Sequence, residues 1–140
     1  MKIKHIKFFI VIALLILPFI TKAETHIKGY DLWNANAVWN KEGSPYVLDE
    51  SLYIPKRSSL RIEKGVTVKL STTTDWNVLS SPMRIEGKLN LWGTIDEPII
   101  FDEIDTIRFN RSTFNIEYGI LKKTNLIVYD STTTISNSII

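Results

Sequence analysis

Two stretches of the chain carry nearly the same pattern. Residues 61–70 read RIEKGVTVKL, and residues 84–93 read RIEGKLNLWG. In both, apolar residues alternate with charged or polar ones, as in a strand that buries one face. A chain that repeats one strand is typical of a solenoid, in which each turn places like residues above like residues. The repeat therefore favours a stacked all-β fold.

The spacing of the repeats predicts which residues stack. Alignment of the two stretches places Leu60 on Met83 and Ile62 on Ile85, and it also matches Val66 with Leu89 and Val68 with Leu91. A second repeat has a shorter offset, and its matched pairs are Ile107 with Leu126, Phe109 with Val128, Ile116 with Ile135, Ile120 with Ile139 and Leu121 with Ile140. The pattern assigns no register between Trp92 and Thr106. An antiparallel sandwich is disfavoured because the chain has no Asn-Gly or Asp-Gly hairpin turn.

The amino terminus has the pattern of a signal peptide. Lys2, Lys4 and Lys7 precede an apolar run over residues 8–20, and a small residue follows at Ala23. A membrane span needs about 20 apolar residues, which this run does not reach. We expect residues 1–23 to contact the membrane only during export and to be cleaved after Ala23. The protein is then secreted, either to the outside or to a bacterial cell envelope.

Removal of this segment changes the charge balance. Four of the 17 basic residues lie within it, so residues 24–140 hold 13 basic and 15 acidic side chains. A slightly acidic chain lacks the basic field that a nucleic acid requires, and nucleic-acid partners are excluded. The chain has no cysteine, so it has neither disulfides nor thiolate metal ligands.

Two longer stretches add a resemblance to a known fold. Residues 44–70 read SPYVLDESLYIPKRSSLRIEKGVTVKL, and residues 83–101 read MRIEGKLNLWGTIDEPIIF. These two stretches resemble the opening coils of bacterial secreted right-handed parallel β-helix repeat proteins. Their superfold includes pectate-lyase-like enzymes and adhesins. The resemblance implies an amino-terminal cap over residues 24–43 and about three to four coils over residues 44–140, without a carboxyl-terminal cap.

Carboxylates are densest between residues 96 and 105. Asp102, Glu103 and Asp105 are candidates for calcium ligands, because Ca²⁺ takes oxygen ligands. Their spacing does not match an EF-hand loop or the Gly-rich nonapeptide calcium repeat, and a solvated corner of the coil explains it better. We expect no cofactor.

An enzymatic interpretation has little support in the residues. Lyases of this superfold combine calcium-binding Asp residues with a positioned basic residue, and Arg84, Arg108 and Arg111 could face outward near the carboxylates. No position matches a lyase motif, so no catalytic residue is assigned. A hydrolase needs two carboxylates at a defined separation. Asp102 and Asp105 are three residues apart, which places them on opposite faces of a strand unless a bend intervenes.

Tryptophan positions suggest a cap and a binding residue. Trp33 and Trp39 precede the first coil and are assigned to the amino-terminal cap. Trp76 lies in the polar stretch STTTDWN, and it is the candidate for stacking on a sugar ring. A polysaccharide or surface glycan is the expected partner.

The last residues, TISNSII, form part of a coil with no polar cap after it. We expect an open apolar end there, which either belongs to a longer natural chain or is covered by stacking with another chain. The predicted function is a secreted or cell-surface scaffold or binding segment, adhesive or in contact with glycans, without a catalytic site. The alternative is the amino-terminal fragment of a polysaccharide lyase or glycoside hydrolase.

Overall fold

The structure is a computed structural model that describes residues 23–29, 32, 35–72 and 81–140. It is all-β, and its parallel strands stack into a solenoid of about four turns, which confirms the predicted fold class. One short 3-10 helix, η1 (Lys41–Gly43), accompanies the strands of the described residues. The strands are β1 (Thr25–Ile27), β2 (Asn36–Trp39), β3 (Tyr46–Leu48), β4 (Leu52–Ile54), β5 (Ser59–Glu63), β6 (Thr67–Leu70), β7 (Met83–Ile85), β8 (Lys88–Trp92), β9 (Ile99–Asn110), β10 (Thr113–Glu117), β11 (Gly119–Tyr129) and β12 (Thr132–Ser136).

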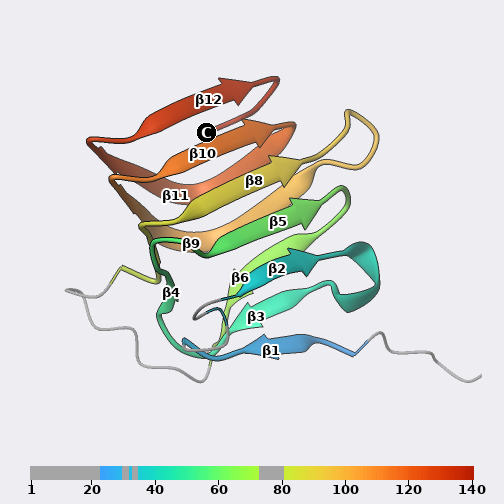
Figure 1. The fold of residues 1–140 in the computed structure, drawn as a ribbon. Coiled ribbons are helices and arrows are strands. Elements are labelled where there is room, and N and C mark those ends of the chain that lie inside the picture. Colours follow the sequence, from blue (N-terminus) through green and yellow to red (C-terminus); the bar gives the residue numbers. More distant parts are fainter. Residues whose placement is uncertain (1–22, 30–31, 33–34, 73–80) are drawn as a thin grey trace, which may run out of the picture.

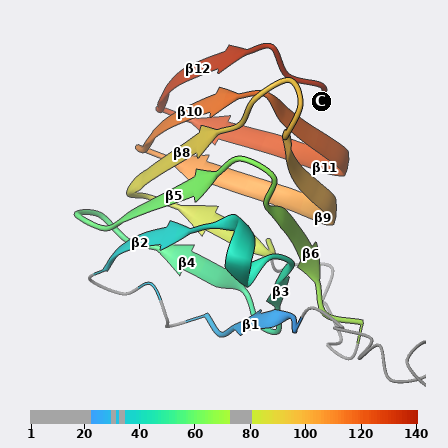
Figure 2. The ribbon, with the colours of Figure 1, turned by 90° about the vertical axis from the view of Figure 1, so that its right-hand side faces the viewer.

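The strands form two parallel sheets. One sheet, called here the front sheet, has the order β12-β10-β8-β5-β2 and lies across the front of the molecule in Figure 1. The second sheet has the order β1-β3-β6-β9-β7-β4, and β11 pairs with β9. Strand β9 pairs with β6 through its first part and with β7 through its second. Figure 2 shows β9 and β11 bending from one side of the stack to the next.

Alternating side chains build the core between the sheets. Leu60, Leu89 and Phe114 occupy equivalent positions of β5, β8 and β10, and each is at most 1% exposed. The rings of Phe109 and Phe114 stack with their centroids 3.7 Å apart. Phe109 belongs to β9 of the second sheet and Phe114 to β10 of the front sheet. Their stacked rings therefore join the two sheets, and this contact stabilises the core in addition to the burial of apolar area.

The register of the first repeat differs from the expected one. Leu60 stacks on Leu89 rather than on Met83, because β5 pairs with β8. Met83 pairs with Leu52 of β4 on another face of the turn. The expected alignment was wrong because strands on different faces of one turn share the same inward Leu or Ile and outward Arg or Glu. Alternation alone does not distinguish one face from another.

The second repeat has the expected register. Strand β11 pairs with β9, so that Ile107 lies beside Leu126 and Phe109 beside Val128. Ile116 pairs with Ile135, and Ile120 forms a bridge with Ile139. The second part of β11 is as far along the chain from β9 as β12 is from β10, so one offset brings these matching faces together.

The amino-terminal residues also lie in parallel register with later strands. Strand β1 pairs with β3, and β2 pairs with β5. Trp39 is 4% exposed and stacks on Tyr46 with a centroid distance of 4.5 Å. Trp33 and the predicted signal peptide, except Ala23, lie outside the described residues. In the part of the chain that the structure describes, no helix is long and apolar enough to span a membrane.

Inward side chains of the last turn reach solvent. Val128 is 43% exposed, Ile135 is 40% exposed and Ile139 is 67% exposed. Two of their partners one turn earlier, Phe109 and Ile116, are at most 2% exposed. The apolar columns of the core therefore end in solvent at this side of the described structure.

Candidate functional site

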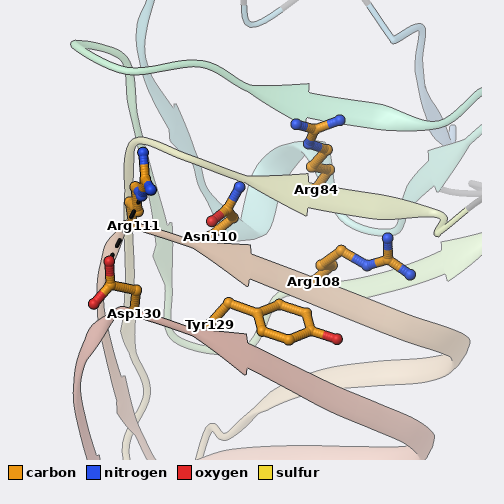
Figure 3. A pocket seen from close by; sticks show the side chains of 6 residues that line it. All are labelled: Arg84, Arg108, Asn110, Arg111, Tyr129 and Asp130. Atoms are coloured by element: carbon orange, nitrogen blue, oxygen red, sulfur yellow. Dashed lines mark ion pairs between the residues drawn. The ribbon is translucent and has the colours of Figure 1, made fainter.

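Three arginine side chains gather on the outer surface where β7, β9 and β11 lie side by side. They border a shallow, open depression of about 430 Å³ (Figure 3). Its lining is Arg84, Arg108, Asn110, Arg111, Tyr129 and Asp130. We call this surface the arginine depression.

The alternation of each strand places these residues. Met83 and Ile85 of β7 are buried, so Arg84 between them points outward. Ile107 and Phe109 of β9 are buried in the same way, and Arg108 points outward. Arg84 and Arg108 are direct partners in the parallel ladder. Two like charges therefore lie on neighbouring strands, about 4.8 Å apart at the backbone.

Arg84 is held by two neighbours. Its guanidinium lies 5.5 Å from the ring centroid of Tyr53, and it donates a hydrogen bond of 2.6 Å to Glu86. The hydroxyl of Tyr53 donates to the same carboxylate at 2.9 Å. The hydrogen bond from Arg84 lowers the pKa of Glu86 from its ordinary value, while burial raises the pKa of Tyr53. Glu86 thus stays ionised and fixes the position of Arg84.

The other two arginines differ in their neighbours. Arg111 lies 3.6 Å from Asp130, an exposed pair at a corner where both residues have φ near 50°. Arg108 forms no ion pair with any residue that the structure describes. The guanidinium of Arg108 is therefore free to accept an anion, and planar guanidinium groups bind carboxylate, sulfate or phosphate through paired hydrogen bonds.

The predicted calcium candidates lie elsewhere and are not brought together. Asp102 lies 3.8 Å from Lys122, and Glu103 accepts a hydrogen bond from Lys123. Asp105 accepts a hydrogen bond of 3.2 Å from Thr106. No group of three His, Cys, Asp or Glu side chains that could hold a metal occurs in the described part of the chain.

A bend in β9 changes the expected orientation of these carboxylates. Glu103 and Asp105 have positive φ values of 57° and 63°, and Ile104 between them is fully buried. Because the strand turns a corner there, Asp102 and Asp105 both lie at the outer surface. The opposite-face rule applies only to a straight strand. The three arginines come together, but none of the three carboxylates lines their depression.

The tryptophan that the structure places on the outer surface is Trp92, which the sequence pattern did not single out. Trp76, the glycan candidate, lies outside the described residues. Trp92, at the end of β8, is 53% exposed and lies over the guanidinium of Arg61 at 5.2 Å. The alternation of residues 88–92, with Leu89 and Leu91 inward, is the signal that would have placed Trp92 on the outer face.

Comparison of the chain with protein-family models, with curated proteins and with solved structures finds no match. The function is therefore argued from the surface of the solenoid itself.

Proposed function

We propose that this protein is a secreted β-solenoid that binds an acidic polysaccharide through the arginine depression. The observation that carries the proposal is the guanidinium of Arg108, which has no ion-pair partner among the described residues and lines the same depression as Arg84 and Arg111. The signal-peptide pattern and the resemblance to bacterial secreted β-helix proteins support export and contact with glycans.

The lining matches the chemistry of an acidic sugar. Three guanidinium groups supply positive charge, and the lining contains a single carboxylate, that of Asp130. Tyr129 is 58% exposed and offers an aromatic ring beside them. Aromatic rings contact the apolar face of a sugar, while arginines bind its carboxylate or sulfate group. An open depression also admits a chain whose ends extend beyond it.

The experiment measures binding of the purified protein to three polymers. They are polygalacturonate, a sulfated galactan and a neutral glucan. We expect binding to one or both acidic polymers, which weakens as salt is raised, and none to the neutral glucan at this site. Arg108→Ala should weaken it roughly 10- to 100-fold, the range expected for a hydrogen bond to a charged group.

Lys122→Ala is the matched control. It removes one positive charge from β11, at a side chain that is 54% exposed and outside the depression. We expect it to change binding less than twofold. Equal losses in Arg108→Ala and Lys122→Ala would mean that net charge alone drives adsorption, and the proposal would be wrong. Preference for polygalacturonate or for the sulfated galactan tells which anionic group is bound.

The alternative, a fragment of a polysaccharide lyase or glycoside hydrolase, is less well supported. The general acid of a glycoside hydrolase needs a raised pKa. Hydrogen bonds from Arg84, Lys41 and Lys123 instead lower the pKa values of Glu86, Glu97 and Glu103, respectively. Release of unsaturated or reducing sugars from polygalacturonate with added calcium, lost in Asp102→Ala, would favour the alternative.

A further inference from the structure

We infer that the front sheet is a second binding surface and that it takes a short neutral oligosaccharide. This surface lies on a different face from the arginine depression, so the inference goes beyond the proposed function. It depends on an exposed aromatic ring at one end of the strands and a polar depression at the other.

Trp92 forms the aromatic end. One face of its ring lies over the guanidinium of Arg61, which also donates a hydrogen bond of 3.0 Å to Glu63. Arg61 thus holds the indole in place while 53% of Trp92 remains exposed. A tryptophan that is fixed from below and open to solvent presents a preorganised surface for the apolar face of a pyranose ring.

A polar depression of about 220 Å³ forms the other end. It lies where β2, β5 and β8 begin, and its lining is Asn36, Arg57, Ser58, Ser59 and Lys88. Ser59 donates a hydrogen bond of 2.8 Å to Asn36. Strand β8 rises about 3.3 Å per residue, so Lys88 and Trp92 lie about 13 Å apart along the strand, a span that a short oligosaccharide covers.

Two buried polar atoms without a hydrogen-bond partner lie beneath this surface. Ser58 is 2% exposed, and its Oγ has no hydrogen-bond partner. The Nε of Arg61 is also buried without a partner. These are the two such side-chain atoms among the described residues. A buried hydroxyl without a partner is costly. The Oγ of Ser58 is enclosed by protein, so the exposed polar side chains of the depression carry the contacts with a sugar.

The charges of the front sheet favour a neutral ligand. The outward charged residues of its strands are Arg61, Lys88, Glu63 and Glu117, two of each sign, and Arg57 adds one positive charge at the polar depression. Between them Asn115 donates a hydrogen bond of 3.1 Å to Asn90, which makes an amide ladder across two strands. Amide and hydroxyl groups donate and accept hydrogen bonds, so together with carboxylates they bind sugar hydroxyls. Such a mixture of groups does not select for an anionic sugar.

The test uses hexasaccharides of β-glucan, xylan and mannan. Binding to the purified protein is followed through the indole N–H signal of Trp92 in a nuclear magnetic resonance titration. We expect at least one hexasaccharide to shift that signal, and Trp92→Ala to weaken its binding at least about tenfold. Trp92→Phe should recover part of the affinity. Arg108→Ala, which tests the proposed function, should leave this binding unchanged.

Lys88→Ala separates binding from folding. Lys88 is exposed and lines the polar depression, so its removal should leave thermal stability nearly unchanged, while the affinity for the hexasaccharide falls several-fold. The inference is overturned if none of the three hexasaccharides binds or if Trp92→Ala binds as tightly as the parent. It is also overturned if the protein dimerises through Trp92, because a second copy would then occupy the surface.

Discussion

Glu97 joins three turns of the solenoid at one corner. Its carboxylate accepts hydrogen bonds from Lys41, after β2, and at 2.9 Å from Lys64, after β5. Glu97 itself follows β8, and its backbone oxygen accepts a hydrogen bond of 3.0 Å from the amide of Gly65. The two lysines, Lys41 first, lower the pKa of Glu97 from 4.5 to about 2.

This cluster predicts a contribution to stability that depends on pH. A carboxylate with a lowered pKa in the folded state stabilises the fold above its unfolded pKa, near 4.5, and loses this effect as pH falls towards about 2. Glu97→Gln should therefore lower the urea midpoint at pH 7, and the difference from the parent should shrink below pH 4.5 and vanish near pH 2.

The measurement is urea unfolding followed by circular dichroism at pH 7, 4 and 2. Glu117→Gln serves as the control, because Glu117 is exposed and forms no ion pair with the described residues. It should show little difference at any pH. A Glu97→Gln difference that persists unchanged at pH 2 would contradict the role assigned to the two lysines.

At the residue scale, much of the inward and outward pattern could be predicted. Alternation placed Leu60 and Ile62 in the core and Arg61 outside, as the structure has them. The arginine depression could not be found in this way. Arg84 and Arg108 lie on strands that are not consecutive in the sequence, and only the pairing of β7 with β9 makes them neighbours.

At the element scale, glycine permits the close approach of successive corners. Gly87 lies between β7 and β8, and its amide donates a hydrogen bond of 3.0 Å to Ile54. A Cβ at this position would lie 2.2 Å from the backbone oxygen of Ser58 and 2.5 Å from that of Pro55. Backbone atoms of the previous turn leave no room for a side chain.

Gly87→Ala should therefore destabilise the protein by more than about 1 kcal/mol, although alanine in a compatible position usually stabilises. Thr113→Ala, one turn away on an exposed position, should change stability by less than about 0.5 kcal/mol. Thermal unfolding of both variants checks the expectation. Equal stability of Gly87→Ala and the parent would show that the corners can move apart.

The lengths of the corners explain why the register was only partly predictable. Ser59 of β5 pairs with Asn36 one turn earlier and with Lys88 one turn later, and the second step is the longer one in sequence. The step from Thr113 of β10 to Thr132 of β12 is shorter than either. Strand patterns do not report corner length, so the first repeat was matched to the wrong face. The second repeat was correct because the second part of β11 and strand β12 share one offset from their partners.

At the scale of the whole molecule, stability should decrease towards β12. This strand pairs on one side with β10, and four of its five residues are exposed. Strand β8 instead lies between β5 and β10, and its inward residues Leu89 and Leu91 are 1% exposed. In a solenoid each turn is stabilised mainly by its neighbours, so a turn with one neighbour opens more easily.

Hydrogen exchange tests this gradient. Backbone amides of β12 should exchange through local opening, at least about 100-fold faster than those of β8, which should require nearly global unfolding. Uniform protection from β8 to β12 would contradict the gradient. It would mean that the exposed apolar columns at Val128 and Ile139 are covered in solution.

The Glu97 cluster also bears on how the protein would respond to force. The strands lie across the axis of the stack, so tension along that axis parts one hydrogen-bonded ladder after another. Lys41, Lys64 and Glu97 fasten the turns that contain β2, β5 and β8 to one another. No such ion pair between turns follows β10 or β12 at this corner in the described structure. Under load the stack should therefore extend from the β12 side, while the first three turns hold as one unit.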